Sequence, residues 1–104
     1  MSDLRIVMTS IDNPEMAQVM AKELVQQKLA ACVQISEEGK SVYLWKGDVC
    51  MDEEYYLNIK TDKHHLDDVL DWLEENHPYD TPEIVILKAK ASDDYHDWLT
   101  NTLA

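Results

Sequence analysis

The chain begins with a strand-like pattern of side chains and continues with a helical one. Positions 4–9 carry mostly branched or large apolar residues in alternation, which predicts a strand buried on at least one face. Between Pro14 and Lys28, apolar residues recur at spacings of three and four, and polar residues take the other face. Asp12 or Asn13 can cap this helix, and Pro14 suits its first turn.

A long hairpin follows this predicted helix. An apolar run over residues 28–35 predicts a second strand, which bends or bulges near Gly39 and resumes over residues 42–45. Lys46-Gly47-Asp48 supplies a turn, after which alternation over residues 53–60 predicts a third strand. Each arm is expected to reach roughly ten residues or more, beyond the usual five or six. Such long edges favour pairing with another chain.

The last third of the chain carries a helix, a strand and a second helix. Thr61 or Asp62 is expected to cap the first of these helices, which ends before Pro78. The following strand, over residues 83–90, is nearly all apolar through Leu87 and is therefore expected to be covered on both faces. Ser92 is expected to cap the terminal helix.

The order of these elements predicts the fold class. Strand, helix, strand, strand, helix, strand and a terminal helix form the split βαβ pattern of an α+β, ferredoxin-like domain with a long hairpin between its second and third strands. Residues 1–104 are expected to form this single domain. Right-handed crossovers place both inner helices on one face of an antiparallel sheet. The other face then needs a cover.

The stretch from His77 to Leu87 concentrates candidate chemistry in a short loop. Pro78 and Pro82 restrict the residues before them, so the loop is held at both ends. An imidazole, a phenol and carboxylates occur together there, at His77, Tyr79, Asp80 and Glu83. A helix stop followed by a strand start explains the same two prolines without any binding role.

Net charge limits the classes of partner. Acidic residues number 21 against 9 basic ones, which gives a formal net charge of −12. Such a field repels phosphate backbones, so nucleic-acid binding is not expected. No window approaches the roughly 20 apolar residues of a membrane span. The first residues show no secretory signal pattern, and a cytoplasmic location is the expectation.

The cysteines and glycines disfavour several kinds of chemistry. Cys32 and Cys50 share no spacing typical of a disulfide framework or a zinc knuckle, and Cys32 is expected to be a buried, inert thiol. Gly39 and Gly47 are the two glycines of the sequence, so a phosphate-binding or dinucleotide-binding loop is not possible. No nucleophile and base stand out as a pair, so we do not expect an enzyme.

Several motifs together resemble one known family. KLAACVQI at residues 28–35, YLWKGDV at 43–49, EEYYLNIKT at 53–61 and HPYDTPEI at 77–84 occur in the same order as in the CutA family of divalent-cation tolerance proteins. The resemblance covers essentially the whole chain. It implies a ferredoxin-like protomer in a homotrimer whose architecture is similar to that of the PII signalling proteins. Such an assembly would cover the open face and the long edges.

The resemblance also implies a candidate metal site. The best-known copper site in the family uses a cysteine near the end of the first strand and two adjacent histidines before Pro-Tyr. This sequence has Met8 and Asn76-His77 at those positions. Methionine suits copper(I), whereas copper(II) prefers several imidazole donors, so the substitutions favour weaker or softer binding. The metal candidates are therefore His77 and Met8, with copper as the favoured divalent metal ion and no organic cofactor.

The remaining histidines are weaker candidates. His64 and His65 are adjacent on a predicted helix and point about 100° apart, so they chelate poorly. His96 lies near Asp93 and Asp97, a spacing that suits either a surface ion or an ordinary polar face.

Two functions follow as alternatives. The first is metal binding in a cleft between subunits lined by Lys60, His77, Tyr79 and Glu83. The second is a PII-like regulatory or scaffolding trimer that binds a small anionic metabolite or a protein partner. Lys60 and Tyr79 discriminate between them, because an anionic ligand needs an ammonium and a metal site does not. Trp45 and Tyr43 are expected at the subunit interface.

Overall fold

The computed structural model describes residues 3–104, and its elements follow the predicted order. They are β1 (Leu4–Ile11), α1 (Pro14–Gln26), β2 (Cys32–Ile35), β3 (Gly39–Trp45), β4 (Asp48–Asp62), α2 (Leu66–Asn76), β5 (Val85–Ala89) and α3 (Asp93–Leu103). Among the described residues, no helix has the length and apolar character needed to cross a membrane.

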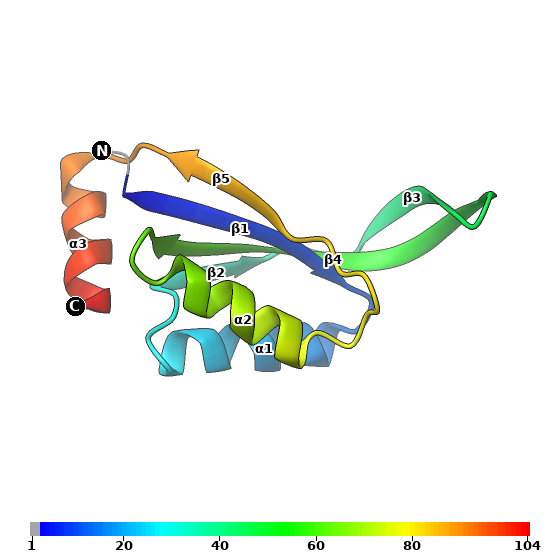
Figure 1. Cartoon of the computed structure of the whole chain (residues 1–104), viewed down its shortest axis with the longest axis horizontal. Coiled ribbons are helices and arrows are strands. Elements are labelled where there is room, and N and C mark those ends of the chain that lie inside the picture. Colours follow the sequence, from blue (N-terminus) through cyan, green and yellow to red (C-terminus); the bar gives the residue numbers. More distant parts are fainter. Residues whose placement is uncertain (1–2) are drawn as a thin grey trace.

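The strands form an antiparallel sheet in the order β2-β4-β1-β5. β3 pairs with the first half of β4, residues 48–54. The second half of β4 lies between β1 and β2, with Ile59 opposite both Val7 and Val33. This topology confirms the α+β, ferredoxin-like prediction. As Figure 1 shows, α1 and α2 both lie on one side of the sheet.

The main core lies between the sheet and these two helices. Its fully buried members come from four elements and include Val7, Leu24, Leu57, Ile59, Val69 and Leu73, each 0 % exposed. Asn13 caps α1 by accepting a hydrogen bond from the backbone N–H of Met16 at 2.9 Å, and Pro14 is the first helical residue, as predicted. The apolar spacing in the sequence therefore produced this layer as expected.

A second, smaller core lies beneath α3 at one end of the sheet. Leu99 and Leu103 of α3 are buried against Leu4 and Ala31. Ser92 accepts a hydrogen bond from the backbone N–H of Tyr95 at 3.3 Å, which confirms the predicted cap. In Figure 1, α3 stands across the end of the sheet that is opposite to the hairpin.

The β3–β4 hairpin projects from the body of the molecule (Figure 1). The whole chain, hairpin included, measures 44 × 24 × 23 Å. β4 is 15 residues long, which agrees with the expectation of a long arm and extends beyond the alternating residues 53–60 at both ends. The expected interruption of the other arm separates β2 from β3 at residues 36–38. The turn uses Lys46 and Gly47 at positive φ angles of 50° and 85°. A two-residue turn of this kind matches the twist of the paired strands.

The start of α2 corrects one prediction. Thr61 and Asp62 belong to β4, and α2 begins only at Leu66, so neither residue is its cap. Asp62 instead accepts hydrogen bonds from the backbone N–H groups of His64 at 3.0 Å and His65 at 2.9 Å. The carboxylate therefore closes the turn between strand and helix, because the sheet register extends β4 further than local preferences suggested.

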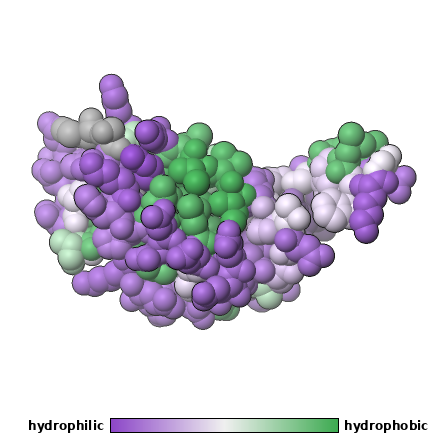
Figure 2. All heavy atoms as spheres, in the orientation of Figure 1, coloured by the Kyte–Doolittle hydropathy of each residue, from purple (hydrophilic) through white to green (hydrophobic). Residues whose placement is uncertain are grey.

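The exposure of β5 corrects another prediction. We expected this strand to be covered on both faces, yet Val85, Ile86 and Leu87 are 44, 43 and 44 % exposed. The physical reason is that β5 is an edge strand. Figure 2 shows two apolar regions on this view, one over β5 and one at the end of the hairpin. A single chain leaves both of them open to solvent.

Candidate functional site

His77 fastens the loop after α2 to the end of β1. Its Nδ1 accepts a hydrogen bond from the backbone N–H of Tyr79 at 3.2 Å. Since Nδ1 is the acceptor, Nε2 carries the proton and donates it to the carbonyl of Ser10 at 2.8 Å. The ring is 7 % exposed and lies edge-on to Tyr79, with centroids 4.7 Å apart. Both ring nitrogens are therefore engaged within the chain.

Tyr79 links the same loop to β4. Its hydroxyl donates to Oε2 of Glu54 at 2.9 Å, and Glu54 is only 7 % exposed. Burial, followed by the hydrogen bond to Glu54, raises the pKa of Tyr79 well above its usual value. The phenol therefore stays protonated at neutral pH and remains a donor to the carboxylate.

A cavity of about 650 Å³, which we call the notch, lies between the hairpin and this loop. Ser10, at the end of β1, lines its base. Three aromatic side chains and five carboxylates also line it: Tyr43, Trp45, Tyr79, Asp12, Asp52, Glu54, Asp80 and Glu83. Its lining includes no lysine, arginine or histidine. The notch therefore joins aromatic surface with negative charge.

The hairpin wall of the notch carries its own polar pair. The Tyr43 hydroxyl donates a short hydrogen bond to Asp52, which pairs with Ser41 across the hairpin. This bond is the main cause that raises the pKa of Tyr43 to about 12. Each wall of the notch thus presents a phenol bonded to a carboxylate, Tyr43 to Asp52 and Tyr79 to Glu54.

The structure brings some of the predicted site residues together and separates others. Tyr79 and Glu83 line the notch, and His77 lies directly behind it through its bonds to Ser10 and Tyr79. The predicted interface residues Tyr43 and Trp45 also line the notch, where they are 40 and 47 % exposed.

Lys60 lies elsewhere on the chain. It lines a second cavity, of about 430 Å³, together with Lys90, Ser92 and Tyr95. Its Nζ is 5.6 Å from the centre of the Tyr95 ring. Burial, followed by the neighbouring Cys32 thiol, raises the pKa of Tyr95. Within one chain, Lys60 therefore does not join Tyr79 and Glu83.

The residues of one chain do not fit a preformed copper site. His77 already uses both ring nitrogens, and Met8 is paired in the sheet opposite Asn58 and Val85. Over residues 3–104, no three histidine, cysteine or acidic side chains are grouped so that they could hold a metal ion. Cys32 and Cys50 are free thiols of intermediate exposure, so Cys32 is less buried than expected.

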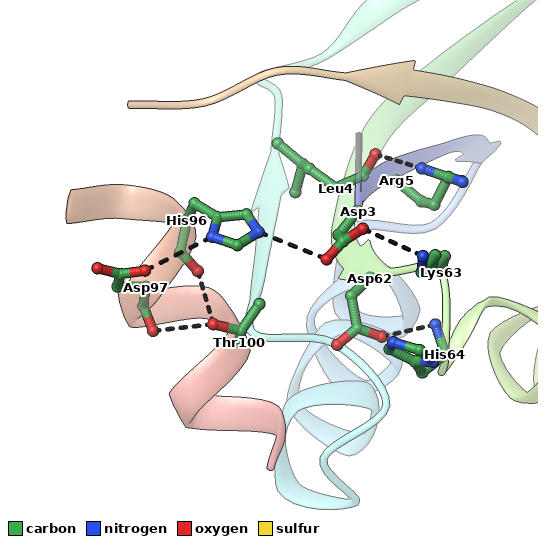
Figure 3. A network of polar contacts seen from close by, with 9 residues as sticks. All are labelled: Asp3, Leu4, Arg5, Asp62, Lys63, His64, His96, Asp97 and Thr100. Carbon is green, nitrogen blue, oxygen red and sulfur yellow. Dashed lines mark hydrogen bonds and ion pairs between the residues drawn. The ribbon is translucent and has the colours of Figure 1, made fainter. Parts of the chain in front are cut away.

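The other histidines form local contacts within the chain. Nδ1 of His65 lies 2.7 Å from Oδ1 of Asp62. Figure 3 shows His96 between two carboxylates, with Nε2 at 3.7 Å from Asp3 and Nδ1 at 3.6 Å from Asp97. Asp3 also pairs with Lys63 at 3.4 Å, which lowers the pKa of its carboxyl. His96 thus joins α3 to the start of the chain's first strand.

Several residues that line the notch were not predicted as site residues from the sequence. Ser10, Asp12, Asp52 and Glu54 lie far along the chain from the loop after α2, and no local motif marks them. The alternating pattern of β4 was the available signal, because it places Asp52 and Glu54 on one face of that strand. The contact between Glu54 and Tyr79, however, is made only in the tertiary structure.

Known proteins give a consistent comparison. The family profile described as "CutA1 divalent ion tolerance protein" matches residues 5–102. A divalent-cation tolerance protein CutA of Thermus thermophilus is 39 % identical over 95 residues, 90 % of this chain and 92 % of the relative. A chloroplastic CutA protein of Arabidopsis thaliana is 40 % identical over 98 residues, and the match spans 93 % of this chain but only 54 % of that relative.

Solved structures agree with the sequence relatives. CutA from Synechococcus elongatus PCC7942 superposes with a TM-score of 0.96 at 35 % identity, covering 100 % of this chain and 93 % of that one. The same protein complexed with a Bis-Tris molecule gives 0.90 at 34 % identity, covering 98 and 95 %. With sequence, fold and element order in agreement, this chain belongs to the CutA1 family of divalent ion tolerance proteins.

Proposed function

We propose that this chain acts in divalent-cation tolerance as a homotrimer that binds a divalent metal ion at or near the cleft between subunits. Membership of the CutA1 family carries this proposal, since the match extends over residues 5–102. The role is one of binding and not of catalysis. We place it in the cytoplasm, although plant relatives are named chloroplastic.

The trimer is supported by the apolar surface that one chain leaves open. Val42, Leu44, Val49 and Met51 on the hairpin are 62, 72, 75 and 63 % exposed. Val42 lies opposite Met51 and Leu44 opposite Val49, so these side chains share one face of the ribbon. Contiguous exposed apolar surface of this kind is typical of a protein interface. The exposed edge strand β5 offers a second such surface.

Copper is the favoured metal, with His77 as its nitrogen donor and Met8 as a thioether donor. The Tyr79 N–H bond to Nδ1 is, at 3.2 Å, longer than the 2.8 Å bond made by Nε2. Nδ1 is therefore the atom that would coordinate a metal ion, and its hydrogen bond from the Tyr79 N–H would then be lost. Since one chain groups too few donors, the site requires donors from a neighbouring subunit or a rearranged loop.

Calorimetric titration of copper and zinc tests this proposal. We expect one copper per chain in the wild type, with weaker binding in Met8→Leu and no comparable heat in His77→Ala. Because His77 also supports the loop, circular dichroism and a melting curve must first show that His77→Ala is folded. His64→Ala serves as the control, because it removes an exposed imidazole that is outside the proposed site. Equal heats and stoichiometry in all four proteins would exclude His77 and Met8 as ligands.

A second candidate function is a PII-like trimer that binds a small anionic metabolite or a protein partner. The observation that favours it is the smaller cavity, which both Lys60 and Lys90 line. Two lysines at one cavity stand out because the chain as a whole is strongly acidic. Ammonium groups at a cavity wall suit phosphate or carboxylate ligands.

Melting curves recorded with inorganic phosphate, citrate and ATP test the second candidate. A stabilising ligand should lose its effect in Lys60→Gln and keep it in Lys22→Gln, which removes an exposed lysine of α1. Unchanged melting across the three compounds would count against it.

A further inference from the structure

We propose that the smaller cavity, beside α3, binds a short aliphatic dicarboxylate, with one carboxylate at Lys60 and the other at Lys90. This site rests on the second candidate function above, and the proposal names the chemical class of the ligand. The cavity has a volume of about 430 Å³. None of its described lining residues belongs to the projecting part of the hairpin, residues 39–54.

The chain itself builds the walls of this cavity. Leu4 and Ile6 of β1 form part of its floor. Val7 is buried in the main core, so Ile6 points to the opposite face of the sheet, which α1 and α2 leave open. At this end of that face α3 supplies the cover, because Leu99 packs against Leu4, and Tyr95 adds a wall. The cavity is therefore formed within one chain, at the end of the sheet opposite to the hairpin (Figure 1).

Two unpaired ammonium groups give the cavity its charge. Lys60 and Lys90 line it, and no described aspartate or glutamate does. Within residues 3–104 neither lysine forms an ion pair, although the chain has 21 acidic residues against 9 basic ones. Lys60 instead lies over Tyr95, with its Nζ 5.6 Å from the ring centre. Positive charge without a partner in so acidic a chain favours an anionic ligand.

Two hydroxyl groups beside the lysines suit the same ligand. The Oγ of Ser92 accepts the backbone N–H of Tyr95 at 3.3 Å, and its own hydrogen has no acceptor in the described chain. That O–H can donate to a carboxylate. Burial raises the pKa of Tyr95, so its phenol stays neutral at physiological pH and does not repel an anion.

The positions of the two lysines favour a ligand with two separate anionic groups. Lys60 belongs to β4 and Lys90 follows β5, and these strands pair with opposite edges of β1. Since neighbouring strands are about 5 Å apart, the backbones that carry the lysines are about 10 Å apart across the sheet. Two ammonium groups repel one another, so each is expected to meet a carboxylate of its own. A molecule that bridges β1 satisfies both.

The floor between the lysines favours an aliphatic body for this ligand. Leu4, Ile6 and Ala89 present apolar side chains to the cavity. Methylene groups gain free energy when they leave water for such a surface, whereas phosphate has none to place there. The volume of the cavity falls within the range of roughly 300–1,000 Å³ that is typical of small-molecule pockets. A few methylenes between two carboxylates therefore match both the floor and the lysines.

Isothermal titration of glutarate into the purified full chain tests this inference. We expect one glutarate per chain, with at least ten-fold weaker binding in Lys60→Gln and in Lys90→Gln. Butyrate is glutarate with one carboxylate replaced by hydrogen, and it should bind the wild type at least ten-fold more weakly than glutarate does. In Lys90→Gln this preference for glutarate should fall below about three-fold, because one carboxylate has lost its partner.

The matched control is Lys22→Gln. It removes the same charge from an exposed position of α1, on the other side of the sheet, and should leave the affinity for glutarate unchanged. Sedimentation velocity and circular dichroism establish that each variant keeps the assembly and fold of the wild type. If Lys60→Gln fails this check, Lys90→Gln still tests the site, since Lys90 is exposed in the segment after β5.

Three outcomes would overturn the inference. The first is neither heat nor a change in melting temperature with glutarate. The second is equal weakening by Lys22→Gln and Lys90→Gln, which would reveal only a dependence on net charge. The third is binding of inorganic phosphate through both lysines as tightly as glutarate, which would mean that they converge on one anion. The third outcome leaves the second candidate function standing, whereas no response to glutarate, phosphate, citrate or ATP would remove both.

Discussion

The body of the molecule and its hairpin use apolar residues in opposite ways. In the body, Leu24, Leu57 and Leu73 are 0 % exposed between the sheet and its helices. On the hairpin, Leu44 and Val49 are 72 and 75 % exposed, although they too belong to regular secondary structure, the strands β3 and β4. Local structure is thus complete in both regions, while burial is complete only in one.

The two regions therefore gain their stability from different contacts. The body buries its apolar surface by folding, so its side chains stabilise a single chain. The hairpin gains nothing comparable until another surface covers it, and a projecting two-stranded ribbon is only marginally stable by itself. We therefore expect mutations in the body to act within the chain and mutations at the hairpin to act on assembly.

The largest effect is expected in the body. Leu73→Ala should lower the free energy of unfolding by about 3 kcal/mol, because it removes a fully buried side chain and leaves a cavity. Urea denaturation at two protein concentrations should give the same loss at both. Val19→Ala, at a position 54 % exposed on α1, is the control and should change the value by less than about 0.5 kcal/mol. Similar losses for both would contradict the assignment of the core.

A second effect concerns the junction between body and hairpin. Tyr79→Phe should lower the free energy of unfolding by about 2 kcal/mol, because it leaves the buried carboxylate of Glu54 without its donor. Tyr43→Phe is the matched control, since its partner Asp52 is exposed and can be hydrated instead. The control should cost less than half as much by thermal or urea unfolding. An equal cost for the two variants would show that burial of Glu54 is unimportant.

A third effect should appear in assembly and not in folding. Leu44→Ser combined with Val49→Ser should weaken the trimer at least ten-fold, about 1.4 kcal/mol, because it removes an opposed apolar pair from the hairpin face. Sedimentation velocity over a dilution series measures this change, and far-ultraviolet circular dichroism should stay unchanged. If the wild type sediments at micromolar concentration as a folded 12.1 kDa species, the proposed trimer is wrong.

The smallest effect depends on alkaline pH. The pKa of Tyr79 is raised in the folded chain, so its stabilising contribution is complete below the unfolded value of about 10. It is then lost as pH rises from that value through the folded pKa. Tyr79→Phe should therefore show a shallower fall in melting temperature above pH 10 than the wild type. Parallel curves for the two proteins would contradict the raised pKa.

Local sequence signals predicted most of the fold. Asn13, as one of two candidates with Asp12, and Ser92 were predicted as caps from residue type and position, and both accept the expected backbone hydrogen bonds. Gly47 was identified as a turn residue, and it takes the positive φ angle that glycine permits. These features depend on neighbours within four residues, so a single sequence contains enough information to place them.

The binding surfaces were less predictable. Glu54 and Tyr79 are 25 positions apart and meet through one hydrogen bond. Glu54 and Lys60 belong to the same strand, but six residues of strand separate them by about 20 Å, and they line different cavities. We predicted Lys60 and Tyr79 to line one cleft between subunits, and within a single chain the length of β4 places them in different cavities.

The order of strands and helices, the ferredoxin-like class and the family could thus be predicted from the amino-acid sequence, because spacing and short motifs are local properties. The folded chain was needed to show that β5 is an exposed edge, that Asp62 closes a turn, and that Ser10 and five carboxylates line one notch. The physical reason is that sheet register sets which distant residues meet. That register follows from the burial of the whole chain and not from any one segment.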